Sequence, residues 1–248
     1  MQRTVTSQIT RQIKPPRRLF SCSRKMSSTP RVISSTELQA NEAKWITLRK
    51  LTYHDAEGIE RLWECAERKS RKSSGIDAVA VLALLRSKTN AFPVSTVVIE
   101  QYRPPVDKFV VELPAGLIDE GETPEQAAFR ELEEETGYKA DGVIESSPII
   151  VSDPGMTNAN MKLVVLNIEL PDKMEYPEQK LELGESITTR VVELSKLDAE
   201  LKGRVLHLVS IQRLDITSNL PEYTKNGFVV DARLSHFASG YDLARRLN

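Results

Sequence analysis

The run GLIDEGETPEQAAFRELEEETGY, residues 116–138, decides what the rest of the sequence is expected to build. It begins with a glycine and ends in a cluster of glutamates. On a helix that advances about 100° per residue, Glu134 and Glu135 lie three and four positions after Glu131, so the three side chains face the same way. Like charges at i,i+4 repel by about 0.2–0.5 kcal/mol per pair on an exposed helix. The cluster is therefore either a solvated acidic face or the binding site of a cation.

The sequence around the cluster favours the cation. Thr123, Pro124 and Gln126 form a capping box with proline at the first helical position, which fixes where the helix begins. Glycines at 116 and 121 allow the preceding segment to turn its backbone toward the carboxylates. An apolar stripe beside the acidic sector, made of Ala128, Phe129 and Leu132, predicts that one flank packs while the adjacent flank binds a metal ion. Ligands that are all oxygen suit a hard ion, Mg²⁺ or Mn²⁺.

The run resembles the Nudix box, G-x5-E-x7-R-E-U-x-E-E-x-G-U, in which U is an apolar residue. Every fixed position is met, by Gly116, Glu122, Arg130, Glu131, Leu132, Glu134, Glu135 and Gly137, and only Tyr138 stands where an aliphatic residue is commoner. The resemblance implies an α/β (α+β) Nudix fold, with a mixed β-sheet sandwiched between helices and a small N-terminal β-hairpin domain. It also implies hydrolysis of a diphosphate linked to another group, with Mg²⁺ as cofactor and Mn²⁺ as a possible substitute.

Segments outside the box resemble the ADP-ribose pyrophosphatase branch of the same family. They are residues 63–68 (WECAER), 101–105 (QYRPP), 112–116 (ELPAG) and 153–155 (DPG), where Pro154 stands 16 residues after Tyr138. The resemblance spans roughly residues 43–240 and implies hydrolysis of ADP-ribose to AMP and ribose 5-phosphate. Two alternatives remain open: a Nudix hydrolase of another nucleoside diphosphate sugar or of an oxidised nucleotide, and a non-catalytic ADP-ribose sensing module.

The resemblance also implies which residues hold the metal. They are the backbone carbonyl of Ala115 and the side chains of Glu131, Glu134 and Glu135. Arg130 is expected to orient these glutamates through an ion pair with Glu134, which lies four positions later on the helix. The expected catalytic machinery therefore includes both Arg130 and Glu134.

The base that activates water is expected from a loop. Residues 171–187 are polar and contain two prolines and a glycine, which predicts a long loop between two strands. In the resembling enzymes this loop carries a catalytic glutamate, and Glu185 matches its position best. Glu182 is the alternative, and an ordinary solvated loop acid is the plain reading of both.

The substrate is expected to contact residues far from the box. The chain contains two tryptophans, and stacking of an adenine ring on an indole stabilises a complex by about 1–3 kcal/mol. Either tryptophan could instead belong to the core. In the resembling enzymes the corresponding tryptophans hold adenine, one of them contributed by the partner subunit, and arginines bind the diphosphate and ribose. The expected substrate-binding set is Trp45, Trp63, Glu64, Arg68, Arg103, Leu117 and Asp153.

The rest of the chain predicts one substantial domain with an appendage. It has 248 residues, of which 40% are hydrophobic and 28% charged, with no run long enough to span a membrane. Strands are expected at 78–85, 95–102, 109–113, 162–170 and 188–194, with a last helix at 232–247. The predicted units are a leader (1–35), a β-hairpin dimerisation region (36–75, strands 44–54 and 60–68) and a Nudix hydrolase domain (76–248). A homodimer is implied by the resemblance, and a net charge of −1 disfavours nucleic acid as a partner.

The first 25 residues differ in kind from the remainder. They carry seven basic residues and no acidic one, so the other 223 residues contain 27 basic and 35 acidic side chains, a net charge of −8. This composition is typical of a mitochondrial transit peptide, although Pro15 and Pro16 interrupt a long amphipathic helix. Met26 could start a shorter cytoplasmic form. The sequence therefore predicts location in the mitochondrial matrix, the cytoplasm or both, with a disordered basic tail as the alternative.

Overall fold

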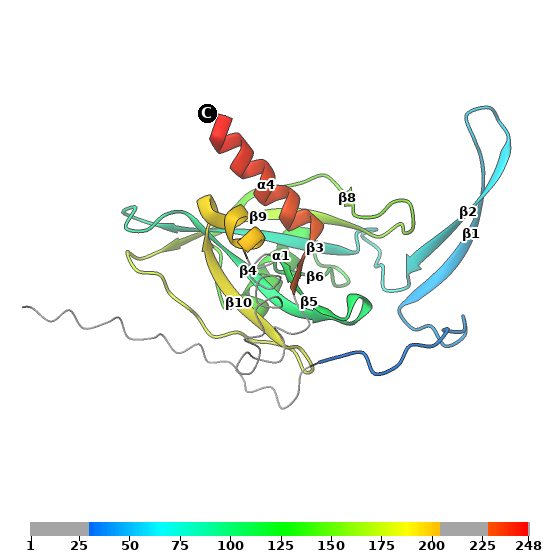
Figure 1. Cartoon of the computed structure of the whole chain (residues 1–248), viewed down its shortest axis with the longest axis horizontal. Helices are drawn as coiled ribbons and strands as arrows, with labels where there is room; N and C mark the ends of the chain where they lie inside the picture. Colours follow the sequence, from blue (N-terminus) through cyan, green and yellow to red (C-terminus); the bar gives the residue numbers. More distant parts are fainter. Residues whose placement is uncertain (1–29, 204–227, 248) are drawn as a thin grey trace, which may run out of the picture.

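A computed structural model describes residues 30–203 and 228–247, and its frame is a nine-stranded mixed sheet (Figure 1). The main strand order is β11-β5-β4-β3-β9-β7, while β10 pairs with β4, β6 with β3 and β8 with β9. The β3–β9 and β11–β5 pairs are parallel, and the other pairs are antiparallel. The strands are β3 (Ala78–Ser87), β4 (Ser95–Arg103), β5 (Lys108–Glu112), β6 (Ala115–Leu117), β7 (Gly142–Ser146), β8 (Ile150–Val151), β9 (Asn160–Leu170), β10 (Ile187–Glu193) and β11 (Phe228–Val230).

Helix α1 (Pro124–Thr136) covers one face of this sheet. Alternate residues of β3 point toward it, because successive side chains of a strand face opposite ways. Val79, Val81 and Leu85 are fully buried in a core that includes Ala128 and Leu132 of the helix. Phe129 packs against the same core, as the apolar stripe in the sequence predicts. The acidic helix is therefore fixed by its apolar flank to the centre of the sheet.

The opposite face is covered by α4 (Ala232–Leu247) and by the segment after β10. That segment contains the 3-10 turn η2 (Leu194–Lys196) and helical residues 197–203. Leu82 of β3, Leu197, and Leu234 and Ala238 of α4 share this second core. Because β3 is buried on both faces, it reads in the sequence as an almost continuous apolar run. The predicted sheet between helices is confirmed.

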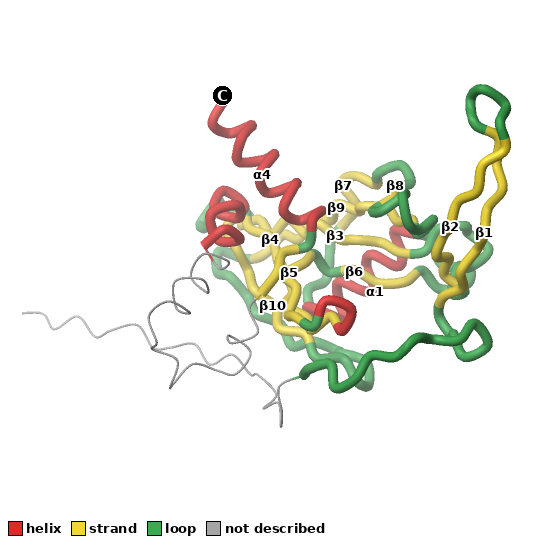
Figure 2. The backbone as a smooth tube through the Cα atoms, turned by 45° about the vertical axis from the view of Figure 1, so that its right-hand side comes forward, coloured by secondary structure: helices red, strands yellow, loops and turns green. Residues whose placement is uncertain are grey.

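A two-stranded hairpin, β1 (Ile46–His54) and β2 (Glu60–Arg68), projects from one end of the molecule (Figure 2). Its attachment lies at the loop after β8, where the Ala66 N–H donates to the Met156 carbonyl at 2.8 Å and Ala66 forms a bridge with Thr157. The predicted hairpin is present. Its first strand was expected at residues 44–54 but begins at Ile46. Trp45 therefore precedes the strand, contrary to the prediction.

The five expected core strands and the last helix are all present, with strand ends that differ by one or two residues. Four short strands were not expected: β6, β7, β8 and β11. The predicted leader lies mostly outside the described residues, and the domain boundaries remain predictions. Among the helices in the described part of the chain, none is both long and apolar enough to cross a bilayer.

Candidate active site

Both ends of α1 are fixed by local hydrogen bonds. At its start the Gln126 N–H donates to Thr123 Oγ1 at 3.2 Å, and the Thr123 N–H donates to Gln126 Oε1 at 2.8 Å, which confirms the capping box. At its end Gly137 adopts a left-handed conformation with φ of 76°, and its N–H donates to the Glu133 carbonyl. These caps set the helical register and with it the direction of the acidic side chains.

The guanidinium of Arg130 holds three carboxylates and one carbonyl. Its Nη1 donates to Glu131 at 2.8 Å and to Glu134 at 3.1 Å, so the expected i,i+4 ion pair is present. Its Nε and Nη2 bind both oxygens of Glu122, and Nη2 also donates to the Leu117 carbonyl at 2.9 Å. The Glu122 hydrogen bonds, more than any other contact, raise the pKa of Arg130 above its usual value. Arg130 therefore joins the loop before the helix to the acidic face.

Glu135 is the most enclosed carboxylate of the cluster, with 4% of its surface exposed. The Ala115 N–H donates to its Oε2 at 3.0 Å. Burial raises the pKa of Glu135 to about 8, and the negative charges of Glu131, Glu185 and Glu112 push it in the same direction. Burial also raises the pKa of Glu131. Burial and like charges thus both disfavour the ionised forms of Glu131 and Glu135.

Gly116 allows the β6 backbone to lie directly against the helix. A Cβ atom at this position would lie 1.9 Å from the Cδ and one carboxylate oxygen of Glu131, far inside van der Waals contact. A side chain at this position would therefore displace the Glu131 carboxylate. The same approach places the Ala115 backbone beside Glu135.

The polar loop after β9, which carries Glu185, lies against the end of α1. Residues 171–186 form neither helix nor strand, as expected, and the Lys180 N–H donates to the Glu134 carbonyl at 2.8 Å. Glu185 is among the charges that raise the pKa of both Glu131 and Glu135. The Glu182 N–H donates to the Glu185 carboxylate at 3.0 Å, so the backbone of Glu182 supports Glu185.

The chemistry of these donors fits a divalent cation. Within residues 30–203 and 228–247, no three His, Cys, Asp or Glu side chains already converge as a set of metal ligands. Arg130 holds Glu131 and Glu134, and the Ala115 N–H holds Glu135. The carboxylates nevertheless supply hard oxygen ligands. Burial, with a smaller contribution from like charges, raises the pKa values of Glu131 and Glu135, so a bound cation would stabilise their ionised forms.

Arg103 lies at the edge of the acidic cluster. Its Nε donates to Glu112 at 2.7 Å, and Glu112 is buried and adds to the field that raises the pKa of Glu135. Sequence reasoning placed Arg103 near the substrate but gave Glu112 no role. An acid directly after the apolar residues 109–111 is the signal that could have identified it. Leu117, which is 41% exposed, borders the site through the carbonyl that binds Arg130.

The remaining expected substrate residues form a second group on and beside the hairpin. Trp63 donates from Nε1 to the Gly155 carbonyl at 3.0 Å, which places it at the turn that contains Asp153. Trp45, Glu64 and Arg68 are exposed, and Glu64 and Arg68 lie on β2. These contacts thus place Trp63 beside the turn with Asp153, whereas Leu117 and Arg103 contact the acidic cluster.

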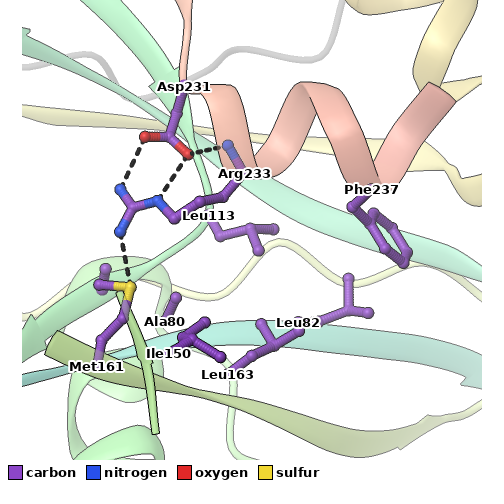
Figure 3. Close-up of a pocket in the computed structure, with 10 residues that line it drawn as sticks. Ala80, Leu82, Leu113, Ile150, Met161, Leu163, Asp231, Arg233 and Phe237 are labelled. Carbon is purple, nitrogen blue, oxygen red and sulfur yellow. Dashed lines mark hydrogen bonds and ion pairs between the residues drawn. The ribbon is translucent and has the colours of Figure 1, made fainter. Parts of the chain in front are cut away.

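A small cavity lies on the other face of the sheet, under the start of α4 (Figure 3). Its walls are mostly apolar and include Leu82, Leu163 and Phe237. The Arg233 side chain points to Asp231, which it binds at 2.7 Å, and also to Met161. The cavity volume is about 60 Å³, which holds roughly two water molecules and neither a ribose nor a purine. This cavity is therefore too small to bind a nucleotide.

Comparison with known proteins gives one family. A model of the NUDIX domain matches residues 76–204. An uncharacterized Nudix hydrolase of Schizosaccharomyces pombe is 38% identical over 85% of this chain and 92% of its own length. The ADP-ribose pyrophosphatase of Saccharomyces cerevisiae is 37% identical over 84% of this chain and 81% of its own length. The ADP-sugar pyrophosphatase of Mus musculus is 36% identical over 77% of this chain and 85% of its own length.

The contact between Gly116 and Glu131 gives a direct test of the metal site. We expect Gly116→Ala to weaken Mn²⁺ binding by about 10–100-fold, because the new Cβ displaces the Glu131 carboxylate. Isothermal titration of the metal-free protein measures this change. Gly142→Ala is the matched control, since a Cβ at Gly142 meets nothing within 4 Å. Unchanged affinity in Gly116→Ala would contradict the assignment of Glu131 to the metal site.

Proposed function

The chain belongs to the NUDIX domain family, and from that premise we propose that it hydrolyses ADP-ribose to AMP and ribose 5-phosphate with Mg²⁺, or Mn²⁺ as a substitute. The observation that carries the proposal is the set of three carboxylates on one face of α1, in which Arg130 holds Glu131 and Glu134 and the Ala115 N–H holds Glu135. The choice of substrate is supported by the names of the yeast and mouse relatives. Hydrolysis of a diphosphate also agrees with the candidate metal ligands, which are all oxygen atoms.

Glu131, Glu134 and Glu135, together with the Ala115 carbonyl, would hold the metal. When bound, the metal neutralises the diphosphate and lowers the pKa of coordinated water. Arg130 keeps Glu131 and Glu134 on one side of the helix through its ion pairs. The Ala115 N–H fixes the rotamer of Glu135 in the same way. These contacts prepare the acidic face before the substrate arrives.

Glu185 serves as the general base. It accepts a proton from the attacking water while the water oxygen forms a bond to one phosphorus of the diphosphate. The bond between that phosphorus and the bridging oxygen breaks, and the bridging oxygen leaves on the other phosphate. Arg103 lies beside the cluster and is suited to bind phosphate oxygens, while Arg68 at the base of the hairpin is a second candidate. The products are two phosphate monoesters.

A wider range of ADP-sugars is the second candidate function, because the mouse relative is named ADP-sugar pyrophosphatase. Exposed tryptophans favour a purine nucleotide but do not distinguish the sugar attached to it. A purely sensing module would have no need for three like charges on one helix face. The substrate range therefore depends on the part of the site around Trp45 and Trp63.

The positions of the two tryptophans support a homodimer. The Lys69 N–H donates to the Trp45 carbonyl, so Trp45 lies opposite Lys69, six residues beyond Trp63 along the second strand. At about 3.3 Å per residue this separates the two positions by roughly 20 Å, too far to enclose one adenine. Trp45 is 74% exposed and Trp63 49%. A second hairpin, from a partner subunit, would bring the two kinds of tryptophan together.

The apolar surface of the hairpin gives the test of the dimer. Leu48 is 79% exposed, and we expect Leu48→Asp to convert a dimer of twice 27.9 kDa into a monomer. Light scattering measures the mass, and KM for ADP-ribose should rise at least about tenfold because the partner tryptophan is lost. Val106→Asp, at an exposed position outside the hairpin, is the control. A monomeric wild-type protein would refute the dimer.

Glu185→Gln tests the proposed base. We expect kcat to fall by about 10²–10⁴-fold with a small change in KM. The amide of glutamine has nearly the size of the carboxylate, but it cannot accept the proton of the attacking water. Chromatography of the products from ADP-ribose, ADP-glucose and UDP-glucose measures both rate and selectivity. Glu182→Gln is the matched control, since its backbone contact with Glu185 survives the change.

Three outcomes separate the alternatives. Faster hydrolysis of UDP-glucose than of ADP-ribose would overturn the substrate. Binding of ADP-ribose without formation of product would favour the alternative of a non-catalytic sensing module. Equal losses in the Glu182 and Glu185 variants would remove the base assignment from Glu185.

A further inference from the structure

Gln179 makes two hydrogen bonds where the loop that carries Glu185, residues 180–186, begins and ends. Its Nε2 donates to the Glu135 carbonyl at 2.5 Å and to the Ile187 carbonyl at 3.1 Å. Both partners are acceptors only, so the nitrogen of the amide must face them and both of its protons are used. Neither the Nudix box nor the resembling segments outside it include this residue.

The two partners of Gln179 belong to different elements. Glu135 lies in the last turn of α1, where a helix leaves its final carbonyls without internal partners. Ile187 is the first residue of β10. Residues 180–186, which include Glu185, connect Gln179 to this strand. The side chain of Gln179 therefore joins the two ends of the loop to each other. It also binds them to α1, the helix that carries the proposed metal ligands.

Neighbouring contacts hold the loop at the same place. The Lys180 N–H donates to the Glu134 carbonyl at 2.8 Å, and the Tyr138 hydroxyl donates to the Glu175 carbonyl. Gly137 is equally close, because a Cβ there would lie 2.4 Å from the Glu178 carbonyl oxygen. The loop thus lies directly across the end of α1.

The tip of the loop is a self-contained turn. The Glu185 N–H donates to the Glu182 carbonyl at 3.2 Å, and the Glu182 N–H donates to the Glu185 carboxylate at 3.0 Å. Leu183 at the tip is fully exposed, and Gly184 has φ of 96°. These bonds fix Glu185 relative to the tip of the loop. The position of the tip relative to the acidic face of α1 depends instead on the two ends of the loop, at Gln179 and Ile187.

We infer that Gln179 is a positioning residue that sets the approach of Glu185 to the reacting water. This inference rests on the proposed function, in which Glu185 is the base. General-base catalysis requires hydrogen-bond reach, and a misplacement of about 1 Å can lower a rate by about 100-fold. Loss of the amide would leave substrate binding nearly intact, because Gln179 faces carbonyls of the loop and helix.

The first test replaces Gln179 by leucine, which has a similar volume and no donor. We expect Gln179→Leu to lower kcat for ADP-ribose by about 10–100-fold while KM changes less than about threefold. Gln179→Glu keeps the size, and its carboxylate repels the two carbonyls, so it should lower kcat at least as much. Lys139→Met is the control, because it removes a surface ion pair with Glu133 outside the loop and should keep kcat within about twofold.

A double-mutant cycle separates positioning from a general structural effect. In a Glu185→Gln background, Gln179→Leu should reduce the residual kcat by less than about twofold, because the base it positions is already absent. A full additional loss in the double mutant, or wild-type kcat in Gln179→Leu and Gln179→Glu, would overturn the inference.

Hydrogen exchange distinguishes failure of the inference from failure of the proposed function. If the wild-type protein hydrolyses none of the three nucleotide sugars, the proposed function fails, and exchange at residues 180–186 then decides whether Gln179 anchors the loop. Exchange there should be at least about tenfold faster in Gln179→Leu, with α1 unchanged. Equal exchange in the two proteins would overturn the anchoring role itself.

Discussion

The buried carboxylate of Glu135 is the constraint on which the rest of the site depends. A carboxylate with 4% exposure and three acidic neighbours is costly to keep charged, and its pKa of about 8 expresses that cost. Two sets of contacts reduce this cost. The Ala115 N–H binds the Glu135 carboxylate directly, and Arg130 binds the carboxylates of Glu131 and Glu134, which precede it on the helix. Accumulated negative charge is useful only where a cation and a polyanionic substrate meet. The arrangement is therefore better explained by catalysis than by stability.

The fold supplies the rigidity that such a cluster needs. Capping contacts at Thr123 and Gly137 fix the ends of α1, and Leu132 anchors its apolar flank to the sheet. Gly116 lets β6 approach the opposite flank, so strand and helix enclose the carboxylates between them. The loop that carries Glu185 then binds carbonyls at the end of the same helix. Helix, strand and loop are thus positioned against one another by short contacts, as a preorganised site requires.

Local features of this protein were readable from the sequence, while long-range ones were not. The helix, its N-terminal capping box and the Arg130–Glu134 pair follow from spacings of three and four residues, and the structure contains all of them. The short strands β6, β8 and β11 carry no periodic pattern and exist because of the neighbours they pair with. The contact of Gln179 with Glu135 joins residues 44 positions apart, and nothing near Gln179 in the sequence announces it. Sequence resemblance placed Glu185 in the loop, but only the folded chain relates it to the carboxylates.

Proton release on metal binding tests the central claim most directly, because a metal ion must displace the proton that the raised pKa of Glu135 retains. A carboxyl with a pKa of about 8 is mostly protonated at pH 7 and mostly ionised at pH 9. Titration of Mg²⁺ into the metal-free protein, in buffers of different ionisation enthalpy, should therefore release about one proton per site at pH 7 and almost none at pH 9. Glu135→Gln should abolish the release. Mg²⁺ binding at pH 7 with no proton released would contradict the account.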